Sequence, residues 1–230
     1  MNMQTSPTAV LEPMDVCKIL VKNGLIKSEK AKEILAKQDK IRQRLIKKRG
    51  PKDNTALTIV DIIASMKMPR GDGNSGVVDE DAIYHALAKE WGYAYKKIDP
   101  LKLDLNLVTS TIPHNFAMKH LVLPIQNQDG TLIVATPNPF NLEVIDDIKR
   151  VCNMSVQVVV SSRSDVVRLI NEFFGFKRSI AAAEDLFAGP SIDIGNLEQY
   201  VRLRSDGEVP HNDQHIVNAV EYMLQHAYDT

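Results

Sequence analysis

Three glycines near the middle of the chain have the spacing of a nucleotide-binding motif. Gly71, Gly73 and Gly76 match the pattern G-x-G-x-x-G, in which glycines let the backbone approach a pyrophosphate closely. That chemistry requires a strand directly before the motif and a helix directly after it. Residues 68–70 instead lie at the end of an expected helix. We therefore interpret the segment as a flexible loop between two helices.

The residues that would hydrolyse ATP are missing from the printed sequence. A P-loop holds nucleotide phosphates with its backbone amides and one lysine. No G-x-x-x-x-G-K-[S/T] pattern occurs among the 230 residues. We expect this chain to have no catalytic residues and no ATPase activity of its own.

Two histidines have the spacing of paired metal ligands. His211 and His215 are four positions apart and could share one face of a helix. However, Pro210 places His211 at the helix start, no carboxylate follows it, and no third ligand is evident. We expect a surface or capping role for both, no metal site and no bound cofactor. Cofactor-binding residues cannot be assigned from the sequence.

A strongly basic stretch runs from Lys27 to Lys52 and includes Lys47, Lys48 and Arg49. A basic helix face can bind anionic lipid, nucleic acid or an acidic protein. It can also be an ordinary solvated face whose lysines extend past apolar neighbours. The stretch has no interleaved aromatic residues for base stacking, and the net charge of the chain is -1. We therefore expect no nucleic-acid partner, and contact with a partner or a membrane surface is the better functional alternative to a solvated face.

Composition is that of a globular protein, with 44% hydrophobic and 25% charged residues. No apolar run approaches the length of a membrane span, and residues 1–8 lack the pattern of a signal peptide. The two cysteines, Cys17 and Cys152, are far apart in apolar surroundings and are expected to be buried, reduced thiols. These features predict a cytosolic protein.

The first part of the chain predicts a helical subdomain over residues 14–92, after a disordered segment 1–13. Two helices separated by Gly24 span residues 14–49, and Ser28 is positioned to cap the second. A short apolar helix covers residues 59–66. A further helix follows the carboxylates at residues 79–81 and ends at Gly92.

Residues 93–176 predict a compact subdomain of mixed sheet and helix. We expect a strand over 93–98, two helical pieces separated at Pro113, and a hairpin with Asp129 and Gly130 at its turn. A helix capped by Asn141 then carries four inward-facing residues: Val144, Ile145, Ile148 and Val151.

A β-branched run over residues 156–160 predicts a well-buried strand. Ser162 and Asp165 form the pattern of a capping box before the last helix of this subdomain. The overall fold class is α+β, with a helical hairpin subdomain followed by the sheet-and-helix subdomain. A linker is expected over residues 177–210 and a helix over 211–230, which ends as if the chain were part of a longer protein.

The second subdomain resembles the N-terminal domain of type II secretion and type IV pilus assembly ATPases, the general secretion pathway protein E family, and is MshE-like. The resemblance covers residues 93–175 and includes the segments 123–125, 131–139, 142–150, 156–160 and 170–174. Residues 214–227 resemble the helix that opens the catalytic region of these ATPases.

This resemblance implies a docking role. The domain would tie a motor ATPase to the cytoplasmic domain of an inner-membrane platform protein, and it would also contact its own C-terminal ATPase domain. The chain would then be cytoplasmic and peripheral to the inner membrane through its partner. Whether the parent machine secretes proteins or builds pili stays open.

The helical subdomain is similar to the cyclic di-GMP-binding modules of the same family. Leu20, Gly24, Ile26 and Gln38 match the first of the two family motifs. Where the motifs begin with Arg-Leu-Gly, this chain has residues 15–17 (Asp-Val-Cys) and residues 58–60 (Thr-Ile-Val). An aspartate in place of the arginine would repel an anionic dinucleotide. We expect no cyclic di-GMP binding, and a cyclic di-GMP receptor remains the alternative function.

Overall fold

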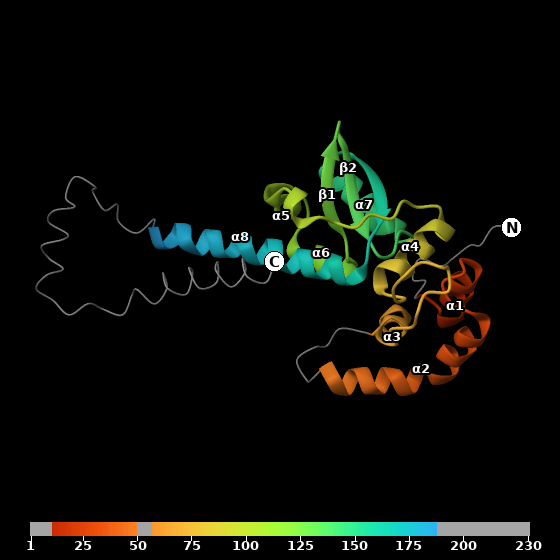
Figure 1. Ribbon diagram of the computed structural model, residues 1–230. Coiled ribbons are helices and arrows are strands. Elements are labelled where there is room, and N and C mark those ends of the chain that lie inside the picture. The colour runs from red at the N-terminus through yellow and green to blue at the C-terminus, as the bar shows by residue number, and fades with distance from the viewer. Residues whose placement is uncertain (1–10, 50–56, 188–230) are drawn as a thin grey trace, which may run out of the picture. The chain divides into compact units, whose positions relative to one another are not determined.

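The computed structural model describes residues 11–49 and 57–187 (Figure 1). This part of the chain contains eight α-helices and a three-stranded sheet, so the expected α+β class is confirmed. The elements, in chain order, are α1 (Pro13–Lys22), α2 (Ser28–Arg49), α3 (Ile59–Ser65), α4 (Glu80–Trp91), the 3-10 turn η1 (Pro100–Lys102), α5 (Leu105–Thr111), α6 (His114–His120), β1 (Leu123–Gln128), β2 (Thr131–Thr136), α7 (Leu142–Cys152), β3 (Ser155–Val160) and α8 (Arg163–Phe187).

Helices α1 to α4 pack around a continuous apolar core. Each helix contributes fully buried side chains to it, among them Leu20, Ile34, Ile62 and Ile83. The expected break between α1 and α2 is at Gly24, whose φ of 71° is a left-handed conformation that glycine adopts at little cost. Met66 ends α3 as its C-cap and is not part of the apolar helix.

The helix ends in this half are formed by the side chains that the sequence places there. Thr58 and Asp61 make a reciprocal capping box at the start of α3. The Asp79 carboxylate accepts a hydrogen bond from Ala82 N at the start of α4 (2.8 Å), and Gly92 ends this helix in the left-handed conformation.

The sheet has the order β1-β2-β3 and encloses a second core with helices α5 to α8. β1 and β2 form the expected antiparallel hairpin, and Asp129 and Gly130 in its turn both have positive φ angles, of 48° and 78°. β3 returns through α7 to pair parallel with β2. Two short helices separated at Pro113 also occur as expected, since Pro113 is the N-cap of α6.

Four expectations about this half were wrong in detail. Residues 93–98 do not form a strand: Tyr95 makes only an isolated bridge to Val160 at the edge of the sheet. β3 is buried only toward its end, because it is an edge strand. Val151 is 78% exposed, since it lies in the last turn of α7, and Asn141 begins α7 without a side-chain capping bond.

The last described helix extends beyond its expected end. α8 runs to Phe187 and includes the first part of the segment 177–210 that we interpreted as a linker. Residues 188–230, which hold the rest of that segment and the expected helix 211–230, lie outside the described residues. None of the helices in the described part is long and apolar enough to cross a membrane.

Glycine-to-alanine changes at two positions should have opposite effects on stability. Gly130→Ala should lower the free energy of unfolding by about 1–2 kcal/mol, because its φ of 78° is unfavourable for a residue with a Cβ. Gly175→Ala should raise it by about 0.5–1 kcal/mol, since Gly175 lies within α8 and an added Cβ meets nothing within 4 Å. Urea unfolding followed by circular dichroism measures both. The same sign for the two variants would contradict this account.

Candidate functional site

The turn that matches the first cyclic di-GMP motif is built from residues that pack the helical core. Gly24 permits the turn, and Leu25 N donates a hydrogen bond to Leu20 O (2.9 Å). The side chains of Leu20 and Ile26 are buried, with exposed fractions of 0% and 5%. The matching motif positions are therefore explained by the helical hairpin itself, without a ligand.

The positions that would contact a ligand in this motif have different chemistry. Asp15 is exposed, and its carboxylate pairs with Lys18 Nζ at 3.2 Å. Val16 and Cys17 are buried, so a side chain fills the place where the family motif has a glycine. The first turn of α1 thus presents a carboxylate where the resemblance expects a guanidinium, and a carboxylate disfavours an anionic ligand.

The glycine-rich loop between α3 and α4 is closed by its own hydrogen bonds. Pro69 and Val77 form an isolated antiparallel bridge, and Arg70 N donates to Gly76 O (3.2 Å). The Arg70 guanidinium donates two hydrogen bonds to the Asp72 carboxylate, at 3.1 and 2.6 Å. These bonds hold the pKa of Asp72 well below its usual range. The charge of the arginine is therefore balanced within the loop.

This loop also contacts the α1–α2 turn, which the sequence pattern did not predict. Gly71 N donates a hydrogen bond to Leu25 O (2.9 Å). A Cβ on Gly71 would lie 2.7 Å from Gly24 O, so only glycine fits at this contact. A helix precedes the three glycines, so the context required for a dinucleotide-binding fingerprint is missing. The glycines serve close packing between two turns that are distant in sequence.

A charged cluster joins α4 to α8 through the segment that follows α4. Lys97 Nζ lies 2.5 Å from Asp81 Oδ2 and 3.0 Å from Asp165 Oδ2. The Tyr95 hydroxyl donates to Asp81 Oδ1 (2.7 Å), and Arg168 Nη2 lies 3.1 Å from Asp165 Oδ1. We call these five residues the junction cluster. The expected capping interaction is present in part, because Asp165 N donates a hydrogen bond to the Ser162 hydroxyl (3.4 Å), while the Asp165 carboxylate is held by the two cations.

Burial and pairing act in opposite directions on the junction cluster. Burial alone raises the pKa of the Asp165 carboxyl, but hydrogen bonds from Lys97 and Arg168 outweigh it and lower the pKa from its usual value. Burial and the hydrogen bond to Asp81 both raise the pKa of Tyr95. The cluster is therefore a set of mutually paired charges that connects α4 and α8.

A small apolar recess lies between the α5–α6 connection and the end of α7. Its volume is about 50 Å³. Ile112, Phe116 and Ile148 contribute to its lining, together with the exposed Val151 and the thiol-bearing Cys152. Such a recess, rimmed by an exposed aliphatic side chain, can receive an apolar side chain of a partner protein.

The remaining candidate ligands are dispersed. Cys17 is buried and Cys152 is half-buried, and burial raises the pKa of both thiols. His211 and His215 lie outside the described residues. Among residues 11–49 and 57–187, no group of three or more His, Cys, Asp or Glu side chains could hold a metal ion.

Residues 91–180 match the model of the MshEN domain family. The chain is homologous to type IV pilus assembly ATPases. It is 26% identical to the ATPase TfpB of Acinetobacter baylyi over 144 residues, 62% of this chain and 24% of the relative. It is 23% identical to the ATPase PilB of Myxococcus xanthus over 153 residues, 66% of this chain and 26% of the relative. The chain thus spans about a quarter of the length of these relatives.

Two solved structures match this chain at low similarity. A structure of MshE with cdg has a TM-score of 0.46 and 17% identity, covering 69% of this chain and 97% of that chain. The N-terminal domain of XpsE has a TM-score of 0.42 and 14% identity, covering 74% of this chain and 97% of that chain.

The Asp165 carboxylate should make the free energy of unfolding of the chain depend on pH. Because its folded-state pKa is lowered, its contribution is present above the unfolded-state value of about 3.9 and is lost as the pH falls through the folded-state value. Asp165→Asn should therefore lose less stability than the parent chain when the pH falls from about 6 to about 3. Urea unfolding at each pH measures the effect.

Asp146→Asn is the control, because its carboxylate is 62% exposed and pairs only with Lys149 on the same helix. It should keep the acid dependence of the parent chain. An unchanged acid dependence in Asp165→Asn would show that the junction cluster contributes no net stabilisation.

Proposed function

We propose that this chain is the docking and regulatory part of a pilus or secretion motor ATPase, and that it tethers the motor to a platform protein of the inner membrane. The observation that carries the proposal is the MshEN domain at residues 91–180 in a chain homologous to type IV pilus assembly ATPases. The chain would work by binding, as a cytoplasmic part that also contacts its own ATPase domain, and would perform no catalysis itself.

The apolar recess is the surface we propose for the platform protein. Val151 is 78% exposed beside the recess, where it could enter an apolar contact with a partner. Asp147 also borders the recess and could orient a basic group of the partner. The recess lies within the MshEN segment, which supports a role shared by proteins of this family.

Val151→Asp should weaken binding of the platform protein by about tenfold or more, because it places a charge in the apolar contact. The assay is calorimetric titration of the chain with the purified cytoplasmic domain of the platform protein encoded by the same bacterium. Leu142→Asp is the matched control, since Leu142 is a 62% exposed apolar residue at the opposite end of α7.

Failure of the parent chain to bind any such domain would overturn the docking function. Equal losses in the two variants would overturn the assignment to the recess.

A cyclic di-GMP receptor is the second candidate function. It is favoured by the helical hairpin at Gly24, which keeps the backbone turn of the family motif. It is opposed by the Asp15 carboxylate and by the internal pairing of Arg70 with Asp72.

Titration of the chain with cyclic di-GMP should release no heat at ligand concentrations far above the micromolar range. The reason is that Asp15 stands where the first motif has its arginine, and that the Arg70 guanidinium in the glycine-rich loop is paired with Asp72. ATP, titrated in parallel, should also give no heat. Micromolar or tighter binding of cyclic di-GMP would instead establish a messenger-controlled module.

A further inference from the structure

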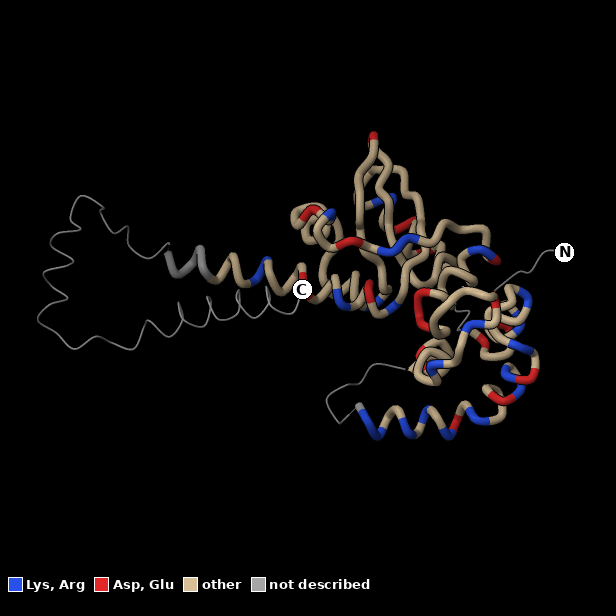
Figure 2. Tube along the Cα trace, in the orientation of Figure 1, with Lys and Arg blue, Asp and Glu red and all other residues tan. Residues whose placement is uncertain are grey.

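The charges of α2 are distributed unevenly along its length. Residues 28–39 contain three basic and three acidic side chains, which balance. Residues 40–49 contain six basic side chains and no acidic one. The six basic residues are Lys40, Arg42, Arg44, Lys47, Lys48 and Arg49. Figure 2 shows this change in charge along the helix.

In the first half of the helix, two lysines pair with a carboxylate of the same helix. Lys30 and Lys37 bind the Glu33 carboxylate at 2.7 and 2.8 Å and lower its pKa to about 2. In the second half, no carboxylate of the described residues forms an ion pair with Lys40, Arg44, Lys47 or Lys48.

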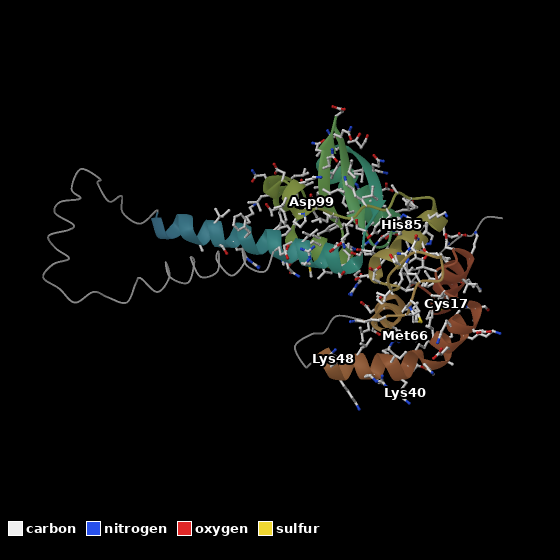
Figure 3. All side chains as sticks on the ribbon, viewed as in Figure 1. Cys17, Lys40, Lys48, Met66, His85 and Asp99 are labelled. Carbon is white, nitrogen blue, oxygen red and sulfur yellow. The ribbon has the colours of Figure 1, made fainter. Side chains whose placement is uncertain are left out.

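These four side chains share one face of α2, which we call the cationic face. Lys40, Arg44, Lys47 and Lys48 recur at i, i+4, i+7 and i+8, the spacing of neighbours on one side of a helix. All four are exposed. In Figure 3 the side chains of Lys40 and Lys48 extend outward from the helix. Ile41 and Leu45, on another side of the helix, pack against the helical core.

We propose that the cationic face binds directly to the anionic surface of a lipid bilayer. A row of lysines and arginines on one helix face is attracted to acidic headgroups, which can move to meet it. This contact goes beyond tethering through a platform protein and does not depend on it.

The composition of the cationic face favours lipid over a protein partner. Three of its four residues are lysines, which are depleted from protein–protein interfaces, and it includes no aromatic anchor. A fluid layer of headgroups requires neither a pocket nor an anchor. Because the face carries no large apolar side chain, the binding should be electrostatic, without deep insertion.

The test uses the 230-residue chain and sedimentation with vesicles of phosphatidylcholine, alone or with one third phosphatidylglycerol. The chain should bind only the acidic vesicles, and raised salt should release it. The variant K40Q/R44Q/K47Q/K48Q should bind them at least about a hundredfold more weakly, at roughly fivefold per removed charge. Circular dichroism checks that its helices are retained.

The variant K18Q/K22Q/K30Q/K149Q is the matched control. It removes the same number of charges, but each of these lysines already pairs with a carboxylate. It should bind acidic vesicles within about tenfold of the parent chain, because paired charges attract the surface less. Equal losses in both variants would overturn the proposal, since net charge alone would then explain the binding.

Two further ligands separate lipid from other anions. Poly-glutamate and double-stranded DNA, offered to the parent chain at the same salt concentration, should compete poorly with the acidic vesicles. Tighter binding of poly-glutamate would overturn the proposal in favour of an acidic protein partner. Tighter binding of DNA would overturn it in favour of a nucleic acid. Neither result would bear on the Val151→Asp test of the docking function.

Discussion

The end of β3 connects the two halves of the described structure. Val160 N donates to Ala94 O and Lys96 N donates to Val160 O, both at 2.8 Å. Neighbouring side chains of a strand point to opposite faces. Accordingly Val159 packs in the core of the sheet, whereas Val160 is fully buried in the core of the helices. The end of β3 therefore belongs to both cores. Its hydrogen bonds position the segment that follows α4, and Val160 packs against the helical core of α1 to α4.

The contacts around this strand end reinforce the same junction. The Ser161 hydroxyl donates to Lys96 O (2.6 Å), and Lys97 pairs with carboxylates of α4 and α8. On the other side Trp91 packs edge-on against Phe140, with ring centroids 5.3 Å apart. Backbone, charged and aromatic contacts thus converge on the residues where the helical half passes into the sheet. A partner that binds one half therefore binds a structure in which that half is held to the other by these contacts.

The two halves carry different kinds of information about function. The MshEN match begins at residue 91 and so covers the sheet half, which also contains the apolar recess. The helical half keeps the backbone turn of a ligand motif but has an aspartate at its start, and it also bears the cationic face.

Local chemistry was readable from the sequence because it depends on neighbouring residues. Glycines at helix ends, the Asp129 and Gly130 turn, and the break at Pro113 all follow from backbone conformations that those residue types prefer. The α+β class and the family resemblance follow from the order of these elements. The cationic stretch was also visible, although not which of its residues share a face free of carboxylates.

Contacts between distant segments required the folded chain. The sequence could not show that β3 lies at a sheet edge, that Val151 is exposed in the last turn of α7, or that Gly71 packs against the turn at Gly24. Nor could it show that the Asp165 carboxylate pairs with Lys97, which lies far from it in the sequence. Side-chain type and spacing set local conformation, whereas burial and pairing depend on which surfaces meet, and this is settled only when the two cores form together.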